Sequence, residues 1–182
     1  MSLDYIKNVW KHKDTSVWLV IIRIIIGLEW FIAGIHKLVN PDYVSGMYYL
    51  LTEVFGADAN PHTWYAYLLD NTFANNSELF AWLVSLGELF IGLTLIFGIF
   101  INFSAIVGFF LNLNFYFAAG WTPTGASTKS LNWIMMVISC IFILSVGVKN
   151  LSVDMYVAEK IPRLRRFLVD WFGFEKREVI NK

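Results

Sequence analysis

The stretch SVWLVIIRIIIGLEWFIAGIHKL, residues 16–38, decides the fold of this chain. A helix of this length reaches ~34 Å, which is enough to cross the ~30 Å hydrocarbon core of a bilayer. A charge near the centre of such a helix costs at least ~2.5 kcal/mol, so ionisable residues there indicate a function by default. The stretch nevertheless contains four of them: Arg23, Glu29, His36 and Lys37.

These four side chains fall on two stripes of the predicted helix. At about 100° per residue, Arg23, Trp30 and Lys37 share one stripe, and Glu29 and His36 share a second about 100° away. With this arrangement, lipid need not contact any of these side chains.

The composition indicates an integral membrane protein that forms a single domain over residues 1–182. Of the 182 residues, 57% are hydrophobic and 15% are charged, and the mean hydropathy is +0.57. Eleven of the fourteen Lys and Arg residues lie before residue 16 or after residue 148, whereas residues 39–78 hold five acidic residues and no Lys or Arg. By the positive-inside rule, we expect a multi-pass plasma membrane protein with both termini cytoplasmic.

This orientation requires an even number of crossings. We predict an all-α fold, an integral membrane four-helix bundle with spans at about residues 16–38, 79–99, 102–119 and 131–148. Residues 79–119 would measure ~60 Å as one straight helix, so they must fold back, and Gly98 to Ser104 is the expected turn. The cytoplasmic tail, residues 149–182, contains an amphipathic segment, Ile161–Phe174, that predicts a helix lying on anionic membrane lipid.

The outer loop, residues 39–78, predicts two short helices. One is expected over residues 43–55, and the other opens with Asn60 as N-cap and Pro61 at the first helical position. We expect the two helices to form a lid over the outer mouth of the bundle. The alternative is that they rest in the membrane interface as an aromatic belt.

Three polar residues fall at one depth in the predicted bundle. Glu29, Glu88 and Asn112 each lie within ~10 to 14 Å of the outer surface and can share one layer. His36 and Lys37 are expected above this layer, and Arg23 below it. The charges of Arg23, Lys37, Glu29 and Glu88 also sum to zero, so buried pairs that only fix the helix register are the alternative interpretation.

Several chemistries have no residues to support them. The single cysteine, Cys140, cannot form a dithiol relay, a disulfide within the chain or an iron–sulfur site, and only His36 of the three histidines lies in a predicted span. We predict no haem, metal or nucleotide cofactor and no binding of nucleic acid.

The order of motifs resembles the DoxX/DoxD family of membrane proteins. The residues are Arg23-(x3)-Gly27-(x6)-Gly34-(x2)-Lys37, then Gly87-Glu88-(x3)-Gly92-(x5)-Gly98, then Asn112-Leu113-Asn114-Phe115. Within this family the chain is most similar to DoxD, identified here as the large subunit of thiosulfate:quinone oxidoreductase, which works with a smaller DoxA subunit. The resemblance implies oxidation of thiosulfate to tetrathionate on the outer face, with electrons passed to membrane quinone.

The resemblance gives the polar residues their expected roles. We expect Arg23, Glu29, His36, Lys37 and Glu88 to be catalytic, and Trp30, Asn112 and Asn114 to contact quinone. Asn114 is offset by about 200° from Asn112, so it reaches the same pocket only if the helix distorts. The expected partners are a DoxA-like small subunit or a respiratory complex, and a second copy of the chain. The alternative functions are a non-catalytic subunit of a respiratory terminal oxidase or other membrane redox complex, and a small proton-coupled transporter.

Overall fold

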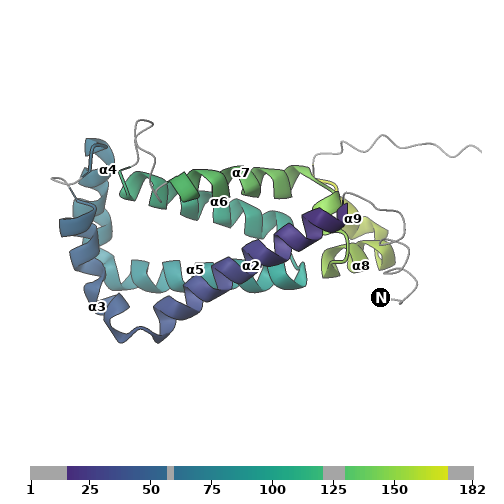
Figure 1. Cartoon of the computed structure of the whole chain (residues 1–182), viewed down its shortest axis with the longest axis horizontal. Coiled ribbons are helices and arrows are strands. Elements are labelled where there is room, and N and C mark those ends of the chain that lie inside the picture. The colour runs from purple at the N-terminus through teal and green to yellow at the C-terminus, as the bar shows by residue number, and fades with distance from the viewer. Residues whose placement is uncertain (1–15, 57–59, 121–129, 172–182) are drawn as a thin grey trace, which may run out of the picture.

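The structure is a computed structural model that describes residues 16–56, 60–120 and 130–171 (Figure 1). Within these ranges the chain is helical and contains no β-strand. The α-helices are α2 (Ser16–Val39), α3 (Pro41–Tyr49), α4 (Thr63–Leu68), α5 (Ser77–Phe97), α6 (Ile101–Ala118), α7 (Ser130–Leu144), α8 (Val153–Lys160) and α9 (Pro162–Leu168). Between them lie two π-helical turns, η1 (Leu50–Val54) and η2 (Leu69–Phe73), and two 3₁₀ turns, η3 (Ala74–Asn76) and η4 (Gly147–Lys149).

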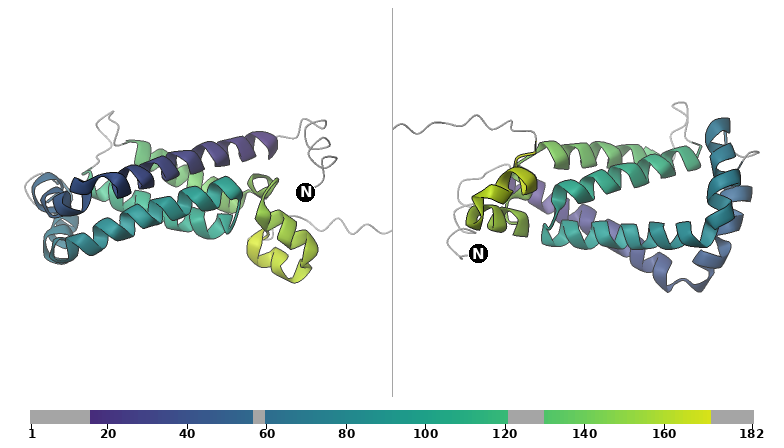
Figure 2. Two further views of the ribbon diagram at one scale, coloured as in Figure 1. Left: turned by 90° about the horizontal axis from the view of Figure 1, so that it is seen from below. Right: turned by 180° about the vertical axis from the view of Figure 1, so that it is seen from behind.

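The four longest helices form two packed pairs. α2 packs along α5, and α6 packs along α7. α5 and α6 meet at the turn that joins them and diverge toward the opposite end, which α3 and α4 cross (Figures 1 and 2). The tail helices α8 and α9 lie at the end where α5 and α6 meet (Figure 2). The two pairs therefore enclose a wedge that widens toward α3 and α4.

Glycines bring α2 and α5 into backbone contact. A Cβ atom added to Gly34 would lie 2.6 Å from the backbone nitrogen of Leu89, and one added to Gly27 would lie 2.9 Å from that of Ile96. On the facing helix, a Cβ atom on Gly92 would overlap the backbone of Phe31. Small residues at such crossings allow close approach between helices in a membrane.

The turn between α5 and α6 lies where the sequence predicted it. Gly98 and Phe100 both adopt positive φ angles, 69° and 51°, and α6 begins at Ile101. The carboxylate of Asp154, on α8, accepts hydrogen bonds from the backbone N–H groups of Phe100 (2.8 Å) and Ile101 (2.9 Å). This tail residue therefore satisfies two backbone donors at the start of α6, as an N-cap side chain does.

The lid, which comprises α3, η1, α4 and η2, lies across the wide end of the wedge (Figure 1). Its first helix starts after Asn40, whose side chain accepts a hydrogen bond from the N–H of Asp42 at 3.0 Å. The predicted start of the second helix was two residues early, because α4 begins at Thr63. Asn60 instead accepts from the N–H of His62 (2.9 Å) and donates to backbone carbonyls of the lid and the end of α6.

Three apolar helical stretches of the described chain are long enough to cross a membrane: Val17–Val39, Thr63–Phe97 and Ile101–Ala118. The predicted fourth span, residues 131–148, is shorter in the structure. α7 ends at Leu144, and η4 follows it. The predicted tail helix over Ile161–Phe174 is present in part as α9, and the short helix α8 precedes it; residues 172–182 lie outside the described ranges.

The tail is held by buried polar side chains. Lys149 is buried, and its ammonium donates to the backbone carbonyls of Val169 (2.9 Å) and Ile143 (3.4 Å). Burial lowers the pKa of Lys149 to about 8, although the nearby carboxylates of Asp170 and Asp154 oppose this shift. Burial also raises the pKa of Asp154, against the stabilising effect of its two backbone hydrogen bonds.

Candidate functional site

The closest charged contact in the bundle joins Lys37 of α2 to Glu88 of α5. The Lys37 ammonium lies 2.5 Å from the Glu88 carboxylate. Glu88 is almost fully enclosed, whereas about a quarter of the Lys37 side chain is exposed. The glycine contacts between α2 and α5 place the two residues opposite each other. The sequence placed Lys37 above the polar layer, but the structure places its ammonium within that layer, at Glu88.

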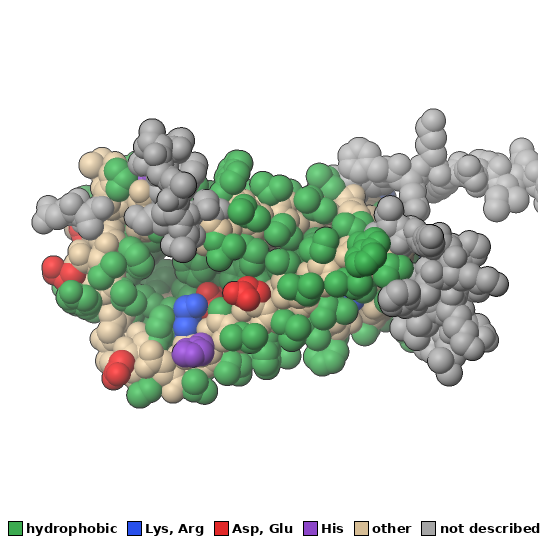
Figure 3. Space-filling view, viewed as in Figure 1, with side chains coloured by type: hydrophobic (Ala, Val, Ile, Leu, Met, Phe, Trp, Pro, Cys, Tyr) green, Lys and Arg blue, Asp and Glu red, His purple; other side chains and the backbone are tan. Residues whose placement is uncertain are grey.

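A groove of about 210 Å³, with both apolar and charged side chains in its wall and named the polar groove for its two carboxylates, opens beside this ion pair. It brings together three residues that the sequence placed at one depth, Glu29, Glu88 and Asn112. Figure 3 shows acidic and basic side chains gathered beside a hollow next to the lid. The groove is lined by Glu29, Trp30, Ala33, Lys37, Glu88, Asn112, Phe115, Leu131, Asn132 and Met135.

A larger cavity of about 590 Å³ lies between the lid and the helix pairs. Its wall is mostly apolar and aromatic, and both π-helical turns of the lid contribute to it. Such turns are rare and occur frequently at functional sites. The residues that line the cavity are Lys37, Tyr43, Met47, Leu50, Leu51, Phe55, Tyr65, Leu69, Phe73, Phe80, Leu83, Val84, Leu111, Asn114, Phe115, Ala118, Ala119 and Asn132.

The cavity and the groove share part of their walls. Lys37, Phe115 and Asn132 line both spaces. The Lys37 side chain therefore borders both a mostly apolar chamber and a groove lined by two carboxylates, and its ammonium contacts one of these, Glu88. This arrangement presents a hydrogen-bond donor to a ligand in the chamber while Glu88 balances its charge.

Two tyrosines of the lid contribute to the cavity, and sequence reasoning missed both. The Tyr65 hydroxyl donates to the side-chain oxygen of Asn114 at 2.8 Å, and the Lys37 ammonium lies 5.9 Å from the ring centroid of Tyr43. Burial and the nearby Glu88 carboxylate raise the pKa of Tyr43, so its hydroxyl stays protonated at neutral pH. The Asn40-Pro41 start signal could have placed α3, but not its position over Lys37.

Asn112 and Asn114 face different spaces, as their offset along the helix predicted. Asn112 lines the groove and donates to the backbone carbonyl of Gly108 at 2.8 Å. Asn114 lines the cavity instead. Trp30 is buried and lines the groove, and it does not line the larger cavity.

Arg23 lies apart from the other predicted site residues. It is buried at the tail end of α2, and its guanidinium donates to the carbonyls of Val148 (2.8 Å), Asn150 (3.2 Å) and Leu151 (3.3 Å). These bonds hold the chain that connects α7 to α8. The structure thus gives Arg23 a role in positioning the tail and brings it to neither the groove nor the cavity.

The two predicted stripes of α2 differ in burial: Arg23 and Trp30 are buried, whereas Glu29 and His36 are both exposed. The cause is the rotation of α2. Glu29 is offset by about 200° from Gly27, and His36 by the same angle from Gly34, so packing the glycine face against α5 turns both side chains outward. Glu29 still borders the groove, whereas His36 lines neither space.

The described residues provide no metal centre. Within them, no three His, Cys, Asp or Glu side chains are close enough together to bind a metal ion, and Cys140 is exposed on α7.

Comparison with protein families identifies the chain. A family model described as TQO small subunit DoxD, where TQO is thiosulfate:quinone oxidoreductase, matches residues 18–171. Neither the curated proteins nor the solved structures include a match. The family description corrects the expectation that DoxD is the large subunit, because it names DoxD the small subunit. Since the match extends from α2 through α9 and covers most of the sequence, the chain belongs to the DoxD family of thiosulfate:quinone oxidoreductase subunits.

Proposed function

We propose that this chain is the quinone-reducing membrane subunit of a thiosulfate:quinone oxidoreductase, with quinone bound in the cavity beneath the lid. The observation that carries the proposal is the position of Lys37 between the cavity and the groove. Lys37 borders the cavity, whose apolar wall suits a quinone ring, and its ammonium contacts the Glu88 carboxylate, which can exchange protons.

The cavity has the size and chemistry that a quinone requires. Sites for small organic ligands typically measure ~300–1,000 Å³ and combine apolar walls with a few polar groups. The 590 Å³ chamber fits this range, and its polar groups include Lys37, Asn114 and Asn132. An ammonium or a side-chain amide donates hydrogen bonds to a carbonyl oxygen, so the quinone oxygens have partners in this wall.

The overall reaction needs protons as well as electrons. Oxidation of two thiosulfate ions to one tetrathionate releases two electrons, and reduction of one quinone to quinol takes up these two electrons and two protons. Glu88 lies at the ion pair, and the exposed Glu29 borders the same groove. We assign to Glu88 the exchange of protons at the site and to Glu29 their passage along the groove, since carboxylates are suited to general acid–base transfer.

The charge distribution supports an orientation for this reaction. We propose four spans, with α7 as the fourth, the lid outside the cell and both termini in the cytoplasm. The lid side is acidic and the tail is basic, as the positive-inside rule requires. Thiosulfate then approaches from the lid side, where the basic side chains include the exposed His36 and the partly exposed Lys37. A small DoxA-like subunit is the proposed partner in thiosulfate oxidation.

The test is quinone reduction by the purified chain, alone and with its native partner. Thiosulfate is added with a short-chain ubiquinone analogue, and the absorbance of the quinone is followed. Lys37→Ala should raise the KM for the quinone by roughly tenfold or more. The change removes the hydrogen bond from Lys37 to the quinone oxygen, and a hydrogen bond from a charged donor contributes ~1.5–3 kcal/mol. Lys160→Ala, which removes an exposed positive charge at the end of α8, is the matched control and should leave KM unchanged. Absence of thiosulfate-dependent reduction with the partner present would refute the proposal.

A further inference from the structure

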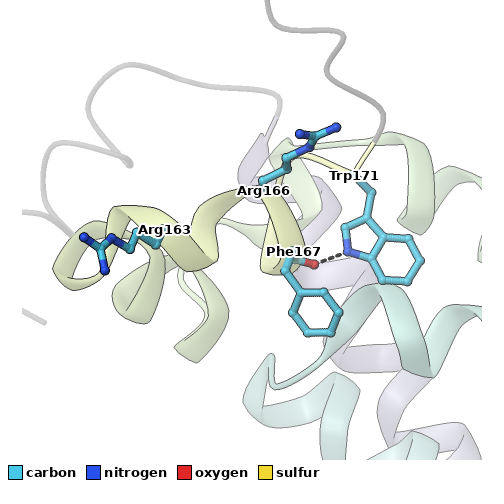
Figure 4. A pocket seen from close by; sticks show the side chains of 4 residues that line it. All are labelled: Arg163, Arg166, Phe167 and Trp171. Carbon is cyan, nitrogen blue, oxygen red and sulfur yellow. Dashed lines mark hydrogen bonds between the residues drawn. The ribbon is translucent and has the colours of Figure 1, made fainter.

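The exposed side of α9 carries two guanidinium groups beside two aromatic rings. Arg163, Arg166, Phe167 and Trp171 are spaced so that they form one stripe along α9 and the turn that follows it. They line an open hollow of about 510 Å³ (Figure 4). The indole N–H of Trp171 donates to the Phe167 carbonyl, and the two ring centroids lie 6.1 Å apart. Figure 4 shows both guanidinium groups reaching outward from the helix.

This stripe lies at the level where the long helices end. Asn102, in the first turn of α6, donates to the carbonyl of Leu168 at 3.3 Å, so the end of α9 is fixed against the start of α6. Around that turn, Phe97, Phe100 and Phe103 are all about half exposed. Exposed phenylalanine rings suit contact with lipid chains, and in the proposed orientation α5 ends and α6 begins at this turn on the cytoplasmic side. The hollow therefore lies near the headgroups of the cytoplasmic leaflet.

The two arginines of the hollow are available for an anion. Arg165, which lies between them in sequence, is paired with Asp170 at 3.0 Å. Within residues 16–56, 60–120 and 130–171, no carboxylate forms an ion pair with Arg163 or Arg166, and both side chains are exposed. A guanidinium matches a phosphate group through paired N–H donors.

We propose that this hollow binds the headgroup of an anionic phospholipid. Arg166, which lies nearer the two rings, contacts the phosphate, Arg163 adds positive charge at the other end of the hollow, and the rings of Phe167 and Trp171 lie against the upper part of the acyl chains. The lipid thereby joins the tail helix to the membrane at a defined site. This binding is independent of the reaction at Lys37 and Glu88.

The experiment uses native mass spectrometry of the full chain purified in detergent. The protein is titrated with phosphatidylglycerol and, separately, with phosphatidylcholine that has the same acyl chains. We expect tighter binding of phosphatidylglycerol, weakened about fivefold by Arg166→Gln, which corresponds to ~1 kcal/mol for one cation at an anionic lipid surface. Arg166→Lys should also weaken it, because the charge remains but the paired donors are lost. Lys160→Gln, which removes one exposed charge outside the hollow, should have no effect.

Three outcomes would overturn the proposal. Equal affinity for the two lipids would exclude headgroup recognition. Equal losses in Arg166→Gln and Lys160→Gln would show a general effect of surface charge. Displacement of phosphatidylglycerol by millimolar inorganic phosphate would assign the hollow to the free anion. All variants are first checked for an unchanged thermal unfolding temperature, and Trp171→Ala provides a charge-neutral variant that should also weaken lipid binding.

Discussion

The Lys37 ammonium lies 2.5 Å from the Glu88 carboxylate, and this contact stands where the apolar cavity beneath the lid meets the polar groove. Lys37 comes from the end of α2, and Glu88 comes from the middle of α5. The pair therefore combines a structural contact between helices with a charged group in the wall of a ligand-sized chamber. The interpretations of a functional site and of a pair that fixes helix register apply to the same two side chains, and mutation can separate them.

We predict that Glu88→Gln preserves the fold and lowers turnover at least tenfold. The amide keeps the shape of the side chain and can accept a hydrogen bond from Lys37, but it cannot exchange a proton. The measurement is kcat for quinone reduction, together with the amount of folded protein in the membrane. Glu78→Gln, an exposed change at the start of the same helix, is the control. Loss of folded protein with unchanged kcat per folded molecule would favour a purely structural pair.

We predict that Gly34→Ala destabilises the protein and also reduces activity. The added methyl group would lie 2.6 Å from the backbone nitrogen of Leu89, so α2 and α5 must separate. Overpacking of this kind costs ~1–3 kcal/mol, and separation of the helices also displaces Lys37 from Glu88. Thermal unfolding and quinone reduction are measured on the same preparation. Gly46→Ala is the control, because nothing lies within 4 Å of its added methyl group, and it should leave both properties unchanged.

We predict that Arg23→Ala acts through stability. The change leaves three buried or partly buried carbonyls without their donor, and each such group costs ~1–3 kcal/mol. The unfolding temperature should fall, and the connection between α7 and α8 should become accessible to proteases. KM for quinone should be unchanged in the fraction that remains folded. A change in KM with normal stability would instead support the catalytic role that the sequence predicted for Arg23.

We predict that stability rises with pH between about 8 and 9.5. Burial lowers the pKa of Lys149 to about 8 in the folded protein, from 10.5. Below pH 8 the lysine is charged in both the folded and the unfolded state, and the burial of its charge opposes folding. As pH rises above 8, only the unfolded state still binds the proton, so the free energy of unfolding increases by at most ~1.4 kcal/mol per pH unit. Thermal unfolding measures the rise, and Lys149→Met should abolish it.

We predict that the lid and the tail lie on opposite sides of the membrane. Cysteines replace the exposed residues Glu53, in η1, and Lys160, at the end of α8, in a Cys140→Ala background. In intact cells, a membrane-impermeant maleimide should label position 53 and not position 160. Opening the cells should expose position 160 and gives the control for reactivity. Labelling of both positions in intact cells would refute the proposed orientation.

The sequence predicted that Glu29, Glu88 and Asn112 lie at one level, because level follows from the rise per residue along a helix, but it missed that the long side chain of Lys37 reaches the same level. Glu29, Glu88 and Asn112 do border one groove. The sequence did not predict the rotation of α2 that leaves Glu29 and His36 exposed, although the residues that cause this rotation lie in α2 itself. Gly27 and Gly34 determine which face of α2 meets α5, and both residues were already visible as a pair of small side chains seven positions apart.

The larger cavity was out of reach of sequence reasoning. Its lid is fixed by Asn60, whose amide bridges the carbonyls of Phe55, Phe117 and Ala118. Such a bond between residues more than fifty positions apart leaves no periodic pattern in the sequence. The same holds for Asp154, which caps α6 from the tail and precedes Ile161–Phe174, the only tail segment that the sequence predicted as a helix.

Because α5 and α6 are joined at one end and diverge toward the other, a small change in the angle between them has its largest effect at their far ends. The angle is set at the turn from Gly98 to Ile101, the fulcrum of this motion, where Asp154 binds the start of α6. A helix of 21 residues such as α5 is ~31 Å long, so a change of about 5° at this fulcrum moves its far end by ~2.7 Å. The lid spans those far ends. The volume of the chamber beneath the lid therefore depends on contacts made at the opposite end of the molecule.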